Sequence, residues 1–198
     1  MRRNLPLSFY RRDAVIIAEE LLGKFLVGNR GAESAARRII DVEVYDGPED
    51  LASHASRGRT PRTEVMFRKG GVWYVYLVYG MHQLLNVVTG PEGYPAAILI
   101  RGVEGAEGPG RVGKLFGVEK ALYGAPAARK SGLWVEDRGI AVPKDSVTRL
   151  PRVGVAYAGA WAQKPLRFVC CRLHKKICAT WTHQFSGLRA RGDGSTHC

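Results

Sequence analysis

The segment DVEVYDGPEDLASHAS, residues 41–56, gathers three side chains that can do chemistry. Its first part has the pattern of a strand, in which side chains two apart share one face, so Glu43 and Tyr45 point the same way. The chain then passes through an acidic turn that ends on His54. A carboxylate so placed can take a proton from water or stabilise a positive charge. The segment therefore predicts a site that pairs a carboxylate with an aromatic ring.

A second charge lies on the apolar strand predicted in PAAILIRGVE. Alternation places Arg101 on the same face as Ala97 and Leu99, where a charge is costly unless it is paired. Glu43 is the natural partner, because it also lies in an apolar strand. From the residues alone, two interpretations stay open: a functional pair and a structural ion pair.

An aromatic strand is predicted in VWYVYLVYGMHQLLN, with Tyr74 and Tyr76 on one face. Tyr79 falls on the other face and directly precedes Gly80, at a hairpin tip where a side chain can protrude. In a basic protein, an aromatic residue at an exposed tip has the shape of a wedge between base pairs. The alternative is an ordinary strand whose rings fill the core.

The remaining motifs are weaker. Asn86 is a lone amide in an apolar strand and needs a buried partner or a ligand. GPGRVG, residues 108–113, resembles a phosphate-binding loop only loosely. All four cysteines lie in the last 29 residues together with three histidines, but their spacing matches no standard zinc pattern. A zinc site there is a minor alternative, and we predict no metal and no cofactor.

These side chains must be positioned by a sheet. DAVIIAEELLG predicts a helix capped by Asp13. Strands are predicted in KFLVG, ARRIIDVEVYD, GVWYVYLVY, QLLNVVTG and PAAILIRGVE, and short connections between the last three indicate antiparallel hairpins. The predicted fold class is α+β: a single mixed domain around a curved, largely antiparallel β-sheet with flanking helices.

The second half of the chain is less regular. Residues 105–132 are Gly-rich and predict a surface excursion around a short helical stretch, whereas residues 133–142 and 151–171 return to strand character. We expect one domain at residues 1–170 and a poorly ordered basic tail at 171–198.

Composition bounds the class of protein. Thirty Lys and Arg against 18 Asp and Glu give a net charge of +12, which favours a polyanionic partner. The longest apolar run, VWYVYLVYGM, is about half of what a membrane-spanning helix needs, and no signal-peptide core forms at the N-terminus. We therefore expect no membrane association and a cytoplasmic, nucleoid-associated bacterial protein, or a nuclear one if the source is eukaryotic.

From about residue 8 to 169 the sequence resembles the alkyladenine (3-methyladenine) DNA glycosylase family, in its single-domain type without a helix-hairpin-helix. The motifs that carry the resemblance are EVYDGPED and YVYLVYGM, followed by AAILIRGVE and RVGVAYAGAWAQKPLRF. The resemblance implies a monomeric, monofunctional enzyme of base excision repair that acts on double-stranded DNA containing a damaged purine. Alkylated purines (3-methyladenine, 7-methylguanine) are the implied substrates, with deaminated and etheno purines as further candidates.

The resemblance also implies roles for matching residues. Glu43 would activate the attacking water, with Arg101 and the backbone carbonyl of Val153 helping to hold that water. The flipped base would be enclosed by Tyr45, His54 and Tyr76, with Asn86 crowding the amino group of normal guanine. Tyr79 would enter the duplex in place of the extruded nucleotide.

Some features depart from the family pattern. His82 follows Gly80-Met81 where other members carry an aromatic residue, and the tail beyond KPLRF has no counterpart. Two rival functions remain: a non-catalytic nucleic-acid-binding module with the same basic aromatic surface, and an enzyme acting on RNA or nucleotides. The first would need neither Glu43 nor Arg101.

Overall fold

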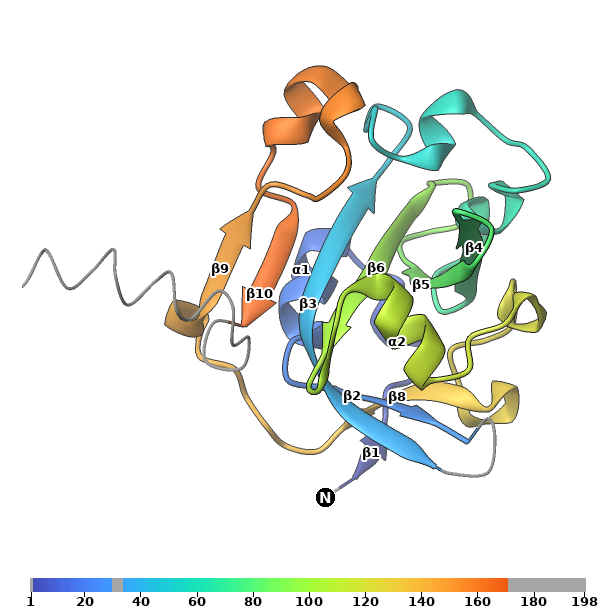
Figure 1. The fold of residues 1–198 in the computed structure, drawn as a ribbon. Coiled ribbons are helices and arrows are strands. Elements are labelled where there is room, and N and C mark those ends of the chain that lie inside the picture. Colours follow the sequence, from blue (N-terminus) through green and yellow to red (C-terminus); the bar gives the residue numbers. More distant parts are fainter. Residues whose placement is uncertain (1, 30–33, 171–198) are drawn as a thin grey trace, which may run out of the picture.

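One curled antiparallel sheet organises the chain, as Figure 1 shows for the computed structural model, which describes residues 2–29 and 34–170. Its strand order is β1-β8-β2-β3-β6-β5-β4, with β10 pairing both β3 and β9, and β7 pairing β6. The strands are β1 Arg3–Asn4, β2 Phe25–Gly28, β3 Ala35–Asp46, β4 Trp73–Val78, β5 His82–Val88, β6 Ala96–Val103, β7 Ala106–Glu107, β8 Leu133–Asp137, β9 Val147–Leu150 and β10 Arg167–Cys170. The predicted single α+β domain is confirmed.

The helices are short. The α-helices are α1 Ala14–Leu21 and α2 Pro109–Leu115, and the 3₁₀ helices are η1 Leu7–Tyr10, η2 His54–Arg57, η3 Glu64–Phe67, η4 Lys120–Leu122, η5 Arg129–Ser131, η6 Lys144–Ser146 and η7 Ala156–Gln163. Helix α1 begins as predicted, because the Asp13 side chain accepts hydrogen bonds from the N–H groups of Val15 and Ile16.

Strand β3 positions the site. Its first part pairs with β2, and its second part pairs with β6 on one side and β10 on the other. The register with β6 shifts around Asp41, which indicates a bulge where the sheet curls. Beyond the bulge, Glu43 lies opposite Leu99 of β6 and Arg167 of β10. Glu43 is therefore inside the sheet, where water reaches it only through a cavity on one face.

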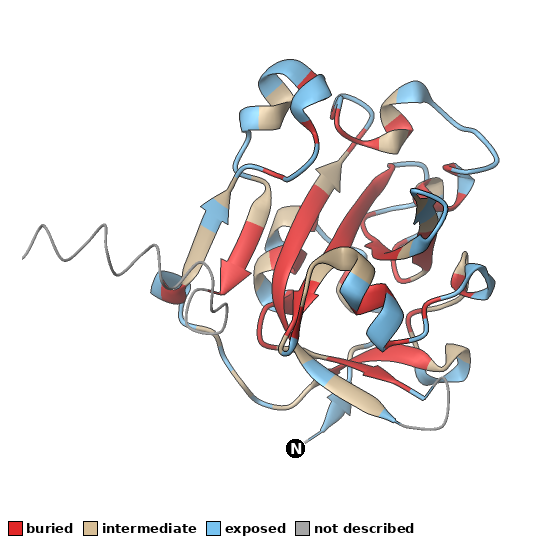
Figure 2. Cartoon of the chain, viewed as in Figure 1, coloured by how far each residue is buried: buried red, intermediate tan, exposed pale blue. Residues whose placement is uncertain are grey.

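Side chains alternate between the two faces of β3 and β4, as expected, throughout the buried parts of these strands. Val42 and Val44 belong to the main hydrophobic core, together with Trp73 and Val75 of β4. Figure 2 shows the buried residues concentrated along the central strands, with the loops above them largely exposed. Burial of one face by these side chains leaves the opposite face free for Glu43.

The 105–132 segment was expected at the surface, and this is only partly right. Helix α2 packs against β5 and β6, and its Val112 and the following Phe116 are buried in the main core. Gly113 permits the close approach, because a Cβ there would lie 2.2 Å from the backbone oxygen of Gln83. Residues 108–113 thus begin a helix packed on the sheet instead of forming a phosphate-binding loop.

The predicted strand character of residues 151–171 is wrong for most of that stretch. Only β10 is a strand, and the preceding chain forms η7 with an interruption at Gly159, whose φ is 57°. Gly154 also has a positive φ, of 78°. Two left-handed positions are incompatible with a continuous strand. The apolar residues here bury against the loop after β3 instead of pairing as a strand.

Within the described residues, 2–29 and 34–170, no helix is long and apolar enough to cross a membrane. The proposed tail at 171–198, with Cys171, Cys178 and Cys198, lies outside the described residues. Cys170 is the last residue of β10 and is buried.

Candidate active site

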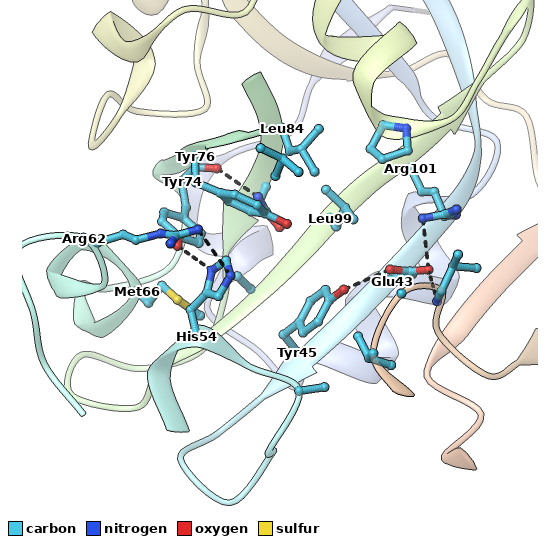
Figure 3. A pocket seen from close by; sticks show the side chains of 18 of the residues that line it. Glu43, Tyr45, His54, Arg62, Met66, Tyr74, Tyr76, Leu84, Leu99 and Arg101 are labelled. Atoms are coloured by element: carbon cyan, nitrogen blue, oxygen red, sulfur yellow. Dashed lines mark hydrogen bonds and ion pairs between the residues drawn. The ribbon is translucent and has the colours of Figure 1, made fainter. Parts of the chain in front are cut away.

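A cavity of about 370 Å³ opens beside β3, β6 and the β4–β5 hairpin. Its volume falls in the range of small-molecule sites. It is lined by all of the residues that the sequence singled out, although they come from positions up to 110 residues apart: Glu43, Tyr45, His54, Tyr76, Tyr79, Asn86, Arg101 and Val153. Figure 3 shows Glu43 and Arg101 at one end of the cavity and the rings of His54, Tyr74 and Tyr76 at the other.

A larger cavity of about 980 Å³ lies elsewhere, between α1 and residues 140–149. It contains none of the eight predicted residues. Its glutamates are partly exposed and form surface ion pairs, Glu19 with Arg149 and Glu20 with Arg12. The smaller cavity is the better candidate because a fully buried carboxylate faces it.

Glu43 is held by three donors. Its Oε1 accepts a hydrogen bond of 2.9 Å from the backbone N–H of Val153, and its Oε2 accepts one of 3.0 Å from the Tyr45 hydroxyl. Nη1 of Arg101 lies 3.4 Å from Oε1. The side chain has no exposed area, so these contacts fix its position. Strand alternation predicted the contacts with Tyr45 and Arg101.

Burial changes the expected protonation of Glu43. An adjacent cation favours the charged form of a carboxyl, and Arg101 does lower the pKa of Glu43, as do the Val153 N–H and the Tyr45 hydroxyl. Burial is the largest effect, however, and it raises the pKa of Glu43 above the ordinary value. The site therefore holds a carboxylate that is more basic than a solvent-exposed glutamate.

Val153 contacts Glu43 through a backbone atom other than the one for which a role was expected. The resemblance pointed to its backbone carbonyl as a ligand of the attacking water, whereas the observed contact is its backbone N–H on the carboxylate. The role of its carbonyl stays a prediction.

Arg101 lies between two carboxylates. Besides Glu43, its Nε is 3.6 Å from Oδ2 of Asp41, and Arg167 binds both Asp41 oxygens at 2.8 and 3.0 Å. Sequence reasoning missed Asp41 and Arg167. Asp41 could have been found, because it is two residues before Glu43 and shares its face.

The other end of the cavity is aromatic. His54 Nδ1 is 2.8 Å from the Tyr74 hydroxyl, and its ring meets Tyr76 edge-on with centres 4.7 Å apart. Burial, with help from Arg62 and Arg57, lowers the pKa of His54 to about 4, so the imidazole is neutral at pH 7. The buried Asn86 donates from Nδ2 to the Tyr74 carbonyl at 3.1 Å, which supplies the partner its sequence context required.

Tyr79 protrudes at the β4–β5 tip and is 88% exposed. Alternation placed it on the face opposite Tyr76, but it lines the same cavity. The reason is the turn: Tyr79 has a φ of 52° and Gly80 one of 69°, so the chain leaves the strand pleat before Tyr79. A non-glycine residue with positive φ is uncommon and often marks a functional position.

A buried ion pair beside the site was not predicted from the sequence. Arg152 binds Asp50 through both terminal nitrogens, one contact being 2.8 Å, and neither side chain has exposed area. Arg152 also donates to the carbonyl of Val44 and lies over the Tyr45 ring at 4.8 Å. This pair fastens the segment carrying Val153 to the loop after β3; Figure 1 shows both segments at the same end of the sheet.

A buried, basic carboxylate with an adjacent arginine, facing an aromatic cavity in a strongly basic protein, supplies the groups that hydrolysis of the bond between a nucleic-acid base and its sugar needs. The comparison with known families agrees. The model of the methylpurine-DNA glycosylase (MPG) family matches residues 8–107 and 104–172, and the chain belongs to this family.

Bacterial relatives support the assignment. Proteins provisionally named 3-methyladenine DNA glycosylase are similar to this chain in Myxococcus xanthus, with 46% identity over 176 residues covering 82% of this chain and 88% of the relative. In Anaeromyxobacter dehalogenans the identity is 43% over 171 residues (83% and 80% covered), and in Legionella pneumophila 42% over 177 residues (84% and 93% covered). The chain is thus a DNA glycosylase for alkylated bases, a hydrolase of DNA repair.

The pH dependence of excision follows from these pKa values. If excision needs ionised Glu43, its rate should fall as the pH drops through a value above 4.5, the ordinary value for glutamate, because burial raises the pKa of Glu43. No inflection near 6.5 is expected from His54, whose pKa is about 4. Single-turnover rates across the pH range test this. An inflection near pH 6.5 that disappears in His54→Gln would contradict it.

Proposed function

We propose that this DNA glycosylase rotates a damaged purine nucleotide out of double-stranded DNA and releases the base by hydrolysis, with 3-methyladenine and 7-methylguanine as its principal substrates. The observation that carries the proposal is the buried Glu43 carboxylate facing an aromatic cavity beside Arg101. We also propose that the enzyme acts as a monomer. Because the relatives are bacterial, we propose that the enzyme acts on chromosomal DNA in the nucleoid.

Base rotation is required because a base stacked in the duplex cannot reach Glu43. Extrusion costs a few kcal/mol, less for a weakly paired damaged base. Tyr79 supports this step, since it is exposed at a hairpin tip on the rim of the cavity. It would occupy the gap that the extruded nucleotide leaves in the stack.

The aromatic wall favours an electron-poor purine. Burial raises the pKa of Tyr74 to about 12 and also raises those of Tyr45 and Tyr76, so all three rings stay uncharged. A cationic N-alkylpurine stacked on such rings gains roughly 0.5 to 2 kcal/mol. Alkylation also makes the purine a better leaving group, so binding and chemistry favour the same lesions.

Hydrolysis then needs a proton acceptor for the attacking water and a group that stabilises the positive charge on the sugar. As the bond from C1′ to the purine breaks, the sugar gains oxocarbenium character, which the Glu43 carboxylate stabilises. The same carboxylate takes a proton from the attacking water while Arg101 orients that water. No lysine lines the cavity in the part of the chain that the structure describes, which supports a monofunctional reaction without strand cleavage.

Substrate range depends on the leaving base. Asn86 lines the cavity and donates a hydrogen bond to the Tyr74 carbonyl, and we infer that it crowds the exocyclic amino group of normal guanine. Deaminated and etheno purines are neutral and gain less cation–π attraction from the aromatic rings, so we infer that they are excised more slowly than alkylated purines. His54 is neutral at pH 7 and does not supply a proton to these bases as an imidazolium.

A base-release panel tests the proposed function. Duplexes that each carry one lesion (3-methyladenine, 7-methylguanine, hypoxanthine or 1,N6-ethenoadenine) are incubated with excess enzyme, with undamaged and RNA duplexes as controls. The proposal predicts fastest release of the alkylated purines from DNA. Release from RNA alone, or from undamaged DNA at the same rate, would contradict it.

Tyr79 gives a separate prediction about DNA binding. Tyr79→Ala should weaken binding to a lesion-containing duplex several-fold more than binding to the same lesion in single-stranded DNA, because an unstacked strand has no gap to fill. Fluorescence anisotropy on both DNAs measures the difference. Leu77→Ala is a matched control, since Leu77 is half exposed on the same hairpin and does not line the cavity. Equal losses on both DNAs would show that Tyr79 is no wedge.

A further inference from the structure

Arg62 is a cation on the aromatic wall that the proposed mechanism does not use. It lies in the loop between η2 and η3 and lines the cavity. Its guanidinium carbon is 5.3 Å from the centre of the Tyr76 ring, and its Nη2 is 3.4 Å from Nε2 of His54. Figure 3 shows the guanidinium beside the His54 and Tyr74 rings.

The charge of Arg62 is not compensated by a nearby acid. Arg101 is paired with Glu43 and Asp41, and Arg152 with Asp50. Across residues 2–29 and 34–170, by contrast, no carboxylate lies within ion-pair distance of Arg62. Arg62 therefore adds a net positive charge to the cavity wall.

This charge acts against one class of substrate. A purine alkylated at a ring nitrogen carries a positive charge, so in the cavity Arg62 repels it. Arg62 also already engages the Tyr76 ring, which reduces the cation–π attraction that this ring can offer to the purine. A neutral damaged purine does not meet this repulsion, and its oxygen and nitrogen acceptors can accept hydrogen bonds from a guanidinium.

We propose that Arg62 is a specificity-determining residue, which lowers the preference of the enzyme for cationic alkylpurines and so extends its range to neutral damaged purines. The inference rests on the proposed function, because it assigns a role inside the same base-binding cavity. Arg62 is exposed, so its charge is partly screened by solvent. For charges about 6 Å apart, a dielectric constant of roughly 40 to 80 gives an expected effect of roughly three- to tenfold in relative rate.

The test compares one cationic and one neutral lesion. Single-turnover release of 7-methylguanine and of hypoxanthine is measured in the same duplex sequence for wild type, Arg62→Gln and Arg62→Lys. The ratio of the 7-methylguanine rate to the hypoxanthine rate should rise roughly three- to tenfold in Arg62→Gln and stay near the wild-type ratio in Arg62→Lys, which keeps the charge.

A neighbouring arginine provides the matched control. Arg59 lies in the same exposed loop, but it stacks on Phe67, pairs with Glu64 and does not line the cavity. Arg59→Gln should leave the ratio unchanged even if DNA binding weakens. An Arg62→Gln ratio equal to that of wild type, with both rates lowered together, would show that Arg62 only binds the DNA backbone and would overturn the inference. A wild-type enzyme that releases neither base would instead refute the proposed function itself.

Discussion

Glu43→Gln should lower the single-turnover rate of 3-methyladenine release by roughly 10²- to 10⁴-fold, because a glutamine cannot accept the proton of the attacking water. The amide has nearly the same shape, and its oxygen can still accept the hydrogen bond from the Val153 N–H. Glu104→Gln is a matched control, since Glu104 is a partly exposed partner of Arg38 outside the cavity. Wild-type turnover by Glu43→Gln would remove this carboxylate from the mechanism.

The same substitution should not destabilise the protein near neutral pH. Burial raises the folded-state pKa of Glu43 above its unfolded value, so folding favours the protonated form. The resulting contribution to stability is fully present below the unfolded pKa and is lost as the pH rises through the folded pKa. Wherever the buried carboxyl is ionised it costs stability, and glutamine removes that cost. We expect the Tm of Glu43→Gln to equal or exceed that of wild type at pH 7, with any advantage shrinking as the solution is acidified.

Arg152→Met should have the largest effect on stability. The substitution leaves Asp50 buried without its partner, and breaking a buried ion pair on one side costs about 3–5 kcal/mol in the free energy of unfolding. That is a large part of the roughly 5–15 kcal/mol that holds a typical domain together. Urea unfolding at pH 7 measures the loss.

An exposed pair on the same molecule provides the comparison. Arg149 and Glu19 form a surface ion pair with both side chains partly exposed, and Arg149→Met should cost less than about 1 kcal/mol. If Arg152→Met cost no more than Arg149→Met, the buried pair would not hold the two segments together.

The site could be predicted well where it depends on strand alternation. Glu43 and Tyr45 share a face because they are two residues apart in β3, and Arg101 meets Glu43 because β6 is the adjacent strand. The central strands were also predicted, since β-branched and aromatic residues between turn signals leave few alternatives.

Other features depend on contacts between distant segments, which no local pattern encodes. Asp50 and Arg152 are separated by about a hundred residues, and their pairing places the Val153 N–H on Glu43. Residues 151–166 are apolar enough to suggest a strand, yet the positive φ angles of Gly154 and Gly159 interrupt an extended chain, and residues 156–163 form η7 instead. The orientation of Tyr79 follows from a positive φ that its residue type does not predict. The raised pKa of Glu43 depends on burial, which competes with the attraction of Arg101.

The most direct measurement is a product analysis of a duplex containing one 3-methyladenine, incubated with wild-type enzyme and with Glu43→Gln, each with and without borohydride. Wild type should release free 3-methyladenine and leave an unbroken strand with one abasic site. Borohydride should trap no covalent adduct, and the folded Glu43→Gln protein should release almost no base. A trapped adduct, a cleaved strand, or equal base release by the two proteins would contradict hydrolysis by a water molecule that Glu43 activates.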